Sequence, residues 1–106
     1  MTFDEYQVAA LRTYKSPLSG QHRLLNGALG LTGEAGEVAD KIKKYIYPSK
    51  PGDGVGVYND VVDELGDVLW YVAVLCNAIG VTMGDVAQGN VDKLAARHGV
   101  EVEPMT

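Results

Sequence analysis

The sequence predicts an all-α protein, a helical bundle of about four main helices whose core is completed by homo-oligomerisation. Apolar residues recur with the period of an α-helix in four segments, and no alternating pattern of the strand type competes with them. The run VLWYVAVLC, residues 68–76, carries no charge, so a helix built from it needs cover on all sides. With 106 residues, the chain is expected to form a single domain, 1–106.

The first two helices are delimited by capping and turn residues. The first is predicted over residues 2–14, because Thr2 and Glu5 have the spacing of a capping box and Ser16 and Pro17 begin a turn. The second is predicted over residues 23–47, since Pro48 disfavours helix in the residue before it.

Four glycines interrupt the second helix, at positions 27, 30, 33 and 36. Each costs a helix about 1 kcal/mol relative to alanine, so a compensating role is expected. On a helical wheel, Gly27 and Gly30 fall beside the acidic face, where they would let a ligand or another backbone approach. Gly33 and Gly36 point elsewhere, and we expect them to allow close helix packing. Close packing is also an alternative explanation for all four glycines.

The third helix is predicted over residues 59–79, with Gly80 as its C-terminal stop. The glycine-rich loop before it, SKPGDGVGVY, is interpreted as a linker, because no strand precedes it and no Gly-Lys-Ser/Thr follows. The fourth helix is predicted from the N-cap Thr82 to His98, with Gly99 after it.

Two pairs of carboxylates, each with a spacing of three residues, fall on the second and third predicted helices: Glu34 with Glu37, and Glu64 with Asp67. Either pair alone is typical of a solvated acidic face. On adjacent helices, however, the two pairs would repel one another unless protons or a cation compensate. Ligands that are all oxygen favour Mg²⁺, with Mn²⁺ as a substitute, over zinc.

Polar and basic side chains share one face of the fourth predicted helix, at Asn90, Lys93 and Arg97. Such a face is usually solvated, but beside an acidic metal site it is a candidate phosphate clamp, with Arg97 suited to bidentate contacts. Lys41, on the same side of the second helix as its carboxylate pair, is a weaker candidate for a phosphate contact.

Composition and charge argue against several classes of function. A net charge of −5 without any basic run disfavours binding to nucleic acid polymers. No apolar stretch reaches the ~20 residues of a membrane span. Asp4 and Glu5 stand where a signal peptide would be basic. Cys76 is the single cysteine, so no internal disulfide can form, and we expect its side chain to be buried. We therefore expect a cytoplasmic protein.

Three segments resemble MazG-like nucleotide pyrophosphohydrolases, members of the all-α NTP pyrophosphatase superfamily: GEAGEVADKIKK, ELGDVLWYVAVLCNAIGV and NVDKLAARHG. The superfamily signature is E-E-x-x-E, a spacer, then E-x-x-D. Its last four acidic positions are matched by Glu34, Glu37, Glu64 and Asp67, whereas Gly33 stands at the first. The resemblance covers about residues 24–99, which leaves 100–106 as a tail.

The resemblance implies hydrolysis of nucleoside triphosphates, often deoxy or non-standard ones, to the monophosphate and pyrophosphate. It implies Mg²⁺ held by the four matching acids, and phosphates contacted by Lys93 and Arg97, with Asn90 at a recurrent polar position. Hydrolysis of a phosphoanhydride also needs an oriented water, and Glu37 or Glu64 is the expected catalytic base.

Two other functions remain open at this stage. The first is a different enzyme of the same fold, such as a phosphoribosyl-ATP pyrophosphohydrolase or a dCTP- or dUTP-specific hydrolase. The second is a non-enzymatic helical interaction module. A bare scaffold has no need to concentrate four carboxylates beside Lys93 and Arg97, which disfavours the second.

The apolar third helix also predicts the assembly. In a monomer of four modest helices, we expect Trp70, Tyr71 and Val74 to be exposed, as a patch of the kind that marks an interface. A second copy related by two-fold symmetry would cover them. The family resemblance points to a dimer or a tetramer as well.

Overall fold

The computed structural model describes residues 1–101, and all regular secondary structure in this part of the chain is α-helix. Four α-helices follow one another: α1 (Phe3–Leu11), α2 (Gly20–Ile46), α3 (Val57–Ile79) and α4 (Met83–His98). The all-α prediction is confirmed. The first helix ends at Leu11 instead of Tyr14, and α2 and α3 begin a few residues earlier than predicted. The predicted tail, 100–106, lies mostly outside the described residues.

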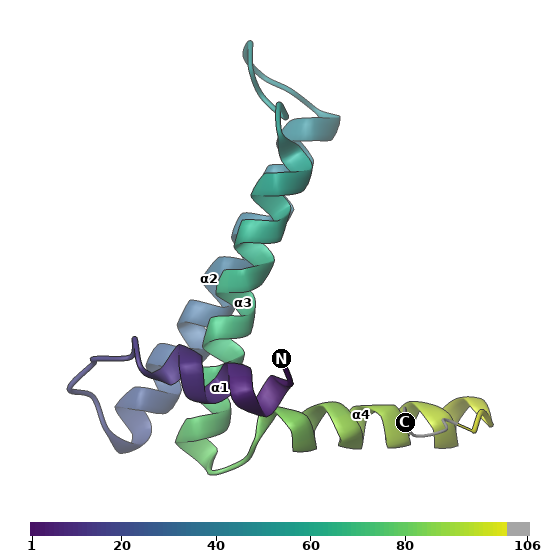
Figure 1. Cartoon of the computed structure of the whole chain (residues 1–106). Coiled ribbons are helices and arrows are strands. Elements are labelled where there is room, and N and C mark those ends of the chain that lie inside the picture. The colour runs from purple at the N-terminus through teal and green to yellow at the C-terminus, as the bar shows by residue number, and fades with distance from the viewer. Residues whose placement is uncertain (102–106) are drawn as a thin grey trace.

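The two long helices, α2 and α3, form an antiparallel hairpin that makes up most of the molecule (Figure 1). Glycine permits their close approach. A methyl group on Gly27 would lie 2.8 Å from the Leu75 side chain, and one on Gly30 would overlap the ring of Tyr71. By contrast, Gly33 and Gly36 face open space. The close approach predicted at Gly27 and Gly30 is therefore confirmed, and it is α3 that approaches. The packing role predicted for Gly33 and Gly36 is wrong, because a methyl group on either would meet nothing within 4 Å.

The short helix α1 holds the lower end of the hairpin and the start of α4 together. The buried Gln7 side chain donates from Nε2 to the Val81 carbonyl (3.1 Å) and accepts from the Met83 N–H (2.7 Å). The Gly84 N–H donates to Oδ1 of Asp4 at 2.8 Å. These bonds satisfy N–H groups in the first turn of α4, which have no partner within that helix, and they fix the direction in which α4 leaves.

That direction is almost perpendicular to the hairpin, since α3 and α4 are bent by 99° (Figure 1). Helix α4 contacts α1 and α3 but makes no contact with α2. The Cα radius of gyration is 16.8 Å, whereas a compact domain of this length has about 13 Å. Within residues 1–101, no single helix is both long enough and apolar enough to span a membrane.

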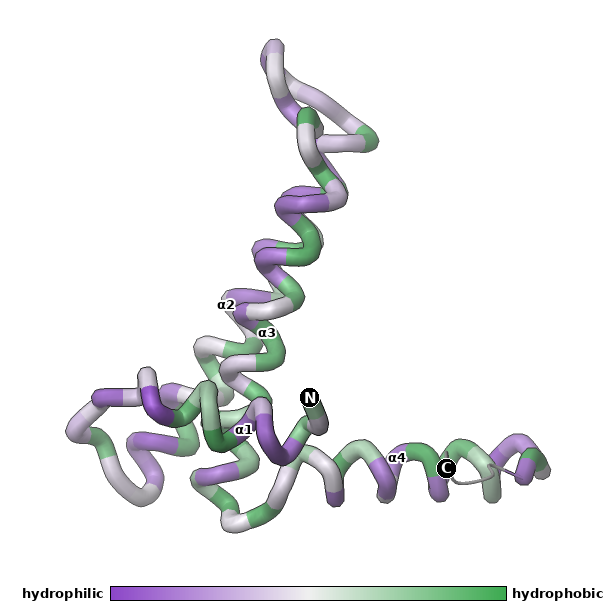
Figure 2. The backbone as a smooth tube through the Cα atoms, in the orientation of Figure 1, coloured by the Kyte–Doolittle hydropathy of each residue, from purple (hydrophilic) through white to green (hydrophobic). Residues whose placement is uncertain are grey.

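The core is correspondingly small and lies where α1, α3 and α4 meet. It is formed by Ala10, Ala73, Cys76 and Met83, and burial raises the pKa of the Cys76 thiol. Figure 2 shows hydrophobic residues recurring along α3 and α4, well beyond this corner. Large apolar side chains that remain exposed on the hairpin and α4 include Leu25, Leu29, Val62, Leu65, Leu69, Val86 and Leu94.

The apolar run of α3, residues 68–76, is more buried within the single chain than the sequence predicts. Val74 is only 1% exposed, because it packs against α2 at Gly27, so its expected exposure is wrong. Trp70 and Tyr71 are half-buried. The Trp70 indole donates to Oγ1 of Thr13 at 2.8 Å, and its ring meets Tyr71 edge-on at 5.0 Å. Along the middle of α3, the exposed apolar residues are Val62, Leu65 and Leu69 instead.

Candidate functional site

Three carboxylates meet between the two helices of the hairpin. Glu34 of α2 and Glu64 and Asp67 of α3 each place an oxygen within 4.8 Å of the other two. The antiparallel arrangement brings them together, since Glu64 and Asp67 lie on successive turns of α3 and face one position on α2. We refer to these three residues as the acidic cluster. It contains three of the four acids singled out in the sequence.

The fourth acid, Glu37, lies one turn farther toward the hairpin tip. It is exposed and does not belong to the acidic cluster, but its charge reaches Glu64. The structure therefore divides the four predicted ligands into three that converge and one that lies beside them.

The cluster is electrostatically strained without a counter-charge. The pKa of the Glu64 carboxyl is raised, first by partial desolvation and then by hydrogen bonding and charge from Glu34, with smaller effects of Asp67 and Glu37. All of these effects disfavour the ionised form. No cationic side chain of residues 1–101 contributes an opposing effect at Glu64.

The donor set fits a hard divalent cation. All donors are carboxylate oxygens, which Mg²⁺ and Mn²⁺ prefer, and the exposed side of the cluster leaves room for water or phosphate oxygens. A cation at this position would also offset the repulsion that raises the pKa of Glu64. Glu34, Glu64 and Asp67 are therefore the residues best placed to hold a metal.

Sequence reasoning missed one neighbour of the cluster, Tyr6 of α1. Its pKa is raised mainly by burial and then by the negative charge of Asp67, so the phenol lies within the electrostatic reach of that carboxylate. In the sequence, Tyr6 is one member of an apolar stripe with Phe3 and Ala10, and no local signal marks it as part of a site.

The residues predicted to clamp phosphates lie elsewhere in a single chain. Lys93 and Arg97 are exposed on α4, and Arg97 lies ~21 Å along the helix axis from Met83 at its start. Because α4 runs away from the hairpin and does not contact α2, these cations do not lie beside Glu34 (Figure 1). One chain thus assembles the acidic half of the expected site but not its basic half.

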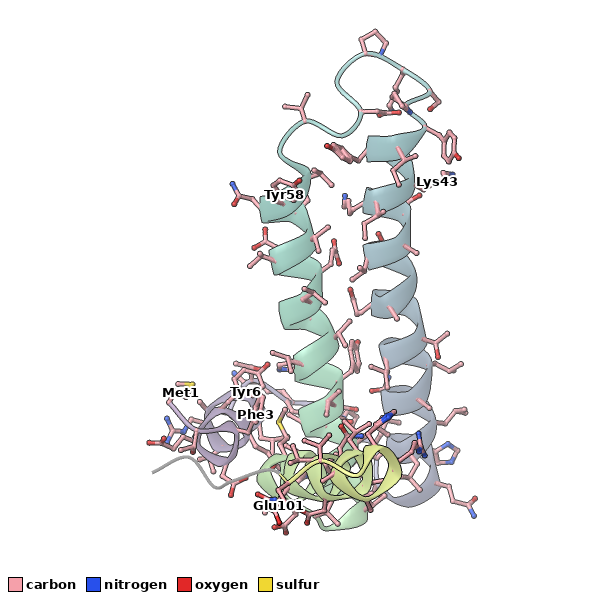
Figure 3. All side chains as sticks on the ribbon, turned by 90° about the vertical axis from the view of Figure 1, so that its right-hand side faces the viewer. Met1, Phe3, Tyr6, Lys43, Tyr58 and Glu101 are labelled. Carbon is pink, nitrogen blue, oxygen red and sulfur yellow. The ribbon has the colours of Figure 1, made fainter. Side chains whose placement is uncertain are left out.

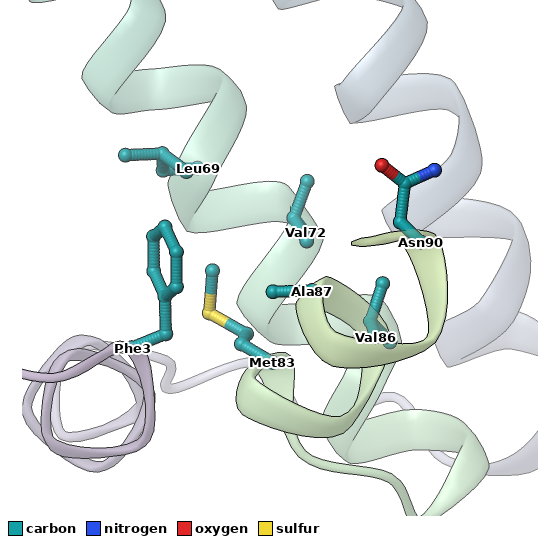
Figure 4. Close-up of a pocket in the computed structure, with 7 residues that line it drawn as sticks. All are labelled: Phe3, Leu69, Val72, Met83, Val86, Ala87 and Asn90. Carbon is teal, nitrogen blue, oxygen red and sulfur yellow. The ribbon is translucent and has the colours of Figure 1, made fainter. Parts of the chain in front are cut away.

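Asn90 lines an open apolar cavity of about 290 Å³ between α1, α3 and α4 (Figure 4). The other lining residues are Phe3, Leu69, Val72, Met83, Val86 and Ala87. Leu69 follows Asp67 by two residues, so the cavity begins at nearly the same level of α3, but on another side of the helix, because two residues turn it by about 200°. Lys41 lies at the opposite end of the hairpin, in a separate cavity near its tip.

Comparison with known proteins identifies the family. The MazG nucleotide pyrophosphohydrolase domain matches residues 23–100. Gene 37 protein of Mycobacterium phage L5 is 41% identical over 104 aligned residues, which cover 92% of this chain and 89% of the phage protein. No solved structure matches the chain. Since the domain match spans most of the chain and includes both helices of the acidic cluster, the protein belongs to the MazG nucleotide pyrophosphohydrolase family.

Proposed function

We propose that this protein hydrolyses nucleoside triphosphates, in particular deoxy or non-standard ones, to the monophosphate and pyrophosphate in a Mg²⁺-dependent reaction. One observation carries the proposal: in a chain of this family, three carboxylates from two helices place their oxygens within 4.8 Å of one another. Concentrated negative charge of this kind is costly unless a cation is bound, and Mg²⁺ is commonly shared between carboxylates and substrate phosphates.

Glu34, Glu64 and Asp67 hold the metal in this proposal. When bound, Mg²⁺ neutralises phosphate charge and polarises the phosphoanhydride. Glu37 is exposed and lies outside the acidic cluster, so its carboxylate stays free to accept a proton from the attacking water. Glu64 is the other candidate for this base, but its place inside the cluster favours a ligand role.

Lys93, Arg97 and Asn90 complete the site from a second copy of the chain. The support comes from the position of α4, which extends away from its own hairpin and carries Lys93 and Arg97 away from its own cluster. A partner's hairpin beside α4 would receive the two cations where substrate phosphates carry negative charge.

The shape and surface of the chain support such an assembly. Leu65 and Leu69 are exposed on α3, next to a cavity lined by apolar residues of α1 and α4. Together with the extended outline and the small core, these exposed apolar residues support burial against a second copy. We infer a homo-oligomer, a dimer or a tetramer, built on a shared bundle.

A turnover panel tests the proposed reaction. Canonical and modified NTPs and dNTPs are incubated with Mg²⁺, and both products are identified by chromatography and ³¹P NMR. We expect the monophosphate and pyrophosphate in equal amounts from the preferred substrates. Formation of the diphosphate and orthophosphate, or no turnover of any triphosphate, would contradict the proposal.

A further inference from the structure

A polar cavity of about 230 Å³ lies at the tip of the hairpin, between the last turns of α2, the loop and the start of α3. We call it the tip cavity. Its charged lining residues are Lys41, Lys44, Lys50, Asp53 and Asp60. Three lysines line this cavity in a protein whose net charge is −5.

The loop that closes the tip cavity is held in one conformation. The Asp53 carboxylate accepts hydrogen bonds from the Ser49 N–H and hydroxyl, both at 3.0 Å, and from the Lys50 N–H at 3.2 Å. Gly54 has a φ of +83°, and a methyl group there would lie 2.8 Å from the Tyr45 Cα. The loop backbone therefore packs directly on α2, so the glycine-rich segment, interpreted from sequence as a linker, builds a wall of the cavity.

The charges in the tip cavity are unequally neutralised. Lys44 forms a salt bridge with Asp40 at 2.9 Å, which is the one salt bridge within residues 1–101. Oδ2 of Asp53 accepts the loop hydrogen bonds, but its negative charge remains and acts on Lys44 and Lys50. Lys41 and Lys50 line the cavity without a salt-bridge partner in the described residues, and Asp53 and Asp60 are the acids beside them. Two free lysines in a concave, partly enclosed space favour a small polyanion.

The tip cavity continues the side of α2 that carries the acidic residues. Lys41 follows Glu37 by four residues and Glu34 by seven, so all three lie on one side of α2, with Lys41 ~6 Å beyond Glu37 along the axis. The charge of Glu37 is also felt at the Lys44 ammonium, where it adds to the larger effect of Asp40 in raising the pKa.

We propose that the tip cavity binds the terminal diphosphate of the substrate, with Lys41 and Lys50 as its contacts; this inference rests on the proposed function. A triphosphate that spans the acidic cluster and the tip cavity has one orientation only. Its α-phosphorus lies at the cluster, its β- and γ-phosphates point to the hairpin tip, and its nucleoside points toward the corner of α1, α3 and α4.

This orientation assigns the tip cavity a part in bond cleavage. The water oxygen forms a bond to the α-phosphorus, and the bond from that phosphorus to the α,β-bridging oxygen breaks. The bridging oxygen leaves with the electron pair as part of pyrophosphate. In-line attack places the water on the side opposite the tip cavity, so in this orientation its proton passes to a carboxylate of the acidic cluster and not to Glu37, which lies on the leaving-group side. Negative charge grows on the leaving group during this step, so Lys41 and Lys50 stabilise the transition state more than the ground state.

Calorimetric titration of the full-length protein with pyrophosphate, in EDTA and at low salt, tests the site without any metal. We expect Lys41→Ala and Lys50→Ala each to weaken pyrophosphate binding about tenfold, the loss of one charge-assisted contact. The matched control is Lys43→Ala, since Lys43 lies on α2 near the tip but does not line the cavity (Figure 3). Asp60→Asn should tighten binding, because it removes the opposing charge.

Kinetics separate this inference from the proposed function. Lys41→Ala should lower kcat and weaken product inhibition by pyrophosphate, whereas Lys43→Ala should change neither. Suppose that the wild type releases pyrophosphate normally but Lys41→Ala behaves like the control Lys43→Ala in calorimetry and in kinetics. The tip cavity then has no such role, and the proposed function stands. If no triphosphate is hydrolysed, the leaving-group role is overturned together with the proposed function, whatever the calorimetry shows.

Discussion

The packing of Gly30 against Tyr71 makes a quantitative prediction about stability. In Gly30→Ala, the new methyl group would overlap the Tyr71 ring. That ring has little freedom to move, because it packs edge-on against Trp70, whose indole is hydrogen-bonded to Thr13. Forcing an extra methyl into a packed interface costs about 1–3 kcal/mol, and the gain in helix propensity returns up to about 1 kcal/mol. We expect a net loss of roughly 1–2 kcal/mol.

Gly36→Ala is the matched control, since Gly36 lies in the same helix but faces open space. It should gain up to about 1 kcal/mol from helix propensity alone. Thermal unfolding followed by circular dichroism, at one fixed protein concentration, should show the two melting temperatures moving in opposite directions, by about 4–8 °C per kcal/mol. A Gly30→Ala variant that melts at or above the wild-type temperature would refute the close packing of α2 on α3.

Three further predictions concern the metal, the phosphates and the assembly. Millimolar Mg²⁺ or Mn²⁺ should raise the melting temperature, because a ligand that binds only the native state stabilises the fold by about 2.7 kcal/mol at 100 times its Kd. A melting temperature that does not change, with or without nucleotide, would count against the cluster. Arg97→Ala should raise KM for the best substrate without altering the circular dichroism spectrum, and unchanged KM and kcat would return Arg97 to a solvated face. Sedimentation equilibrium at micromolar concentration should show a dimer or tetramer, and an active species at 11.3 kDa would contradict the shared bundle.

The helices and the acidic cluster could be predicted because their signals are local. The capping box of Thr2 and Glu5 is present, as is the Thr82 cap of α4. The cluster follows from two carboxylate pairs on helices that a loop of ten residues, 47–56, obliges to pack antiparallel.

What could not be predicted depends on contacts between distant residues. A helical wheel does not show which face of α2 packs, so the sequence left open whether a ligand or a helix approaches Gly27, and it wrongly assigned Gly33 to packing. The direction of α4 is fixed by Gln7 and Asp4, more than 70 residues away in sequence, through single hydrogen bonds. The tip cavity depends on positive φ angles at Gly52, Gly54 and Gly56. Glycine permits a positive φ angle, but its presence in a sequence does not predict one.

The central claim is that the acidic cluster holds the metal that hydrolysis requires. The most direct test measures Mn²⁺ binding by electron paramagnetic resonance and, in parallel, the release of pyrophosphate. Glu64→Gln should abolish tight Mn²⁺ binding and slow pyrophosphate release by at least ~100-fold. Asp63→Asn is the matched control, because Asp63 is the adjacent acid of α3 and lies outside the cluster; it should retain both properties. A Glu64→Gln variant that binds Mn²⁺ and releases pyrophosphate as the Asp63→Asn variant does would contradict the claim.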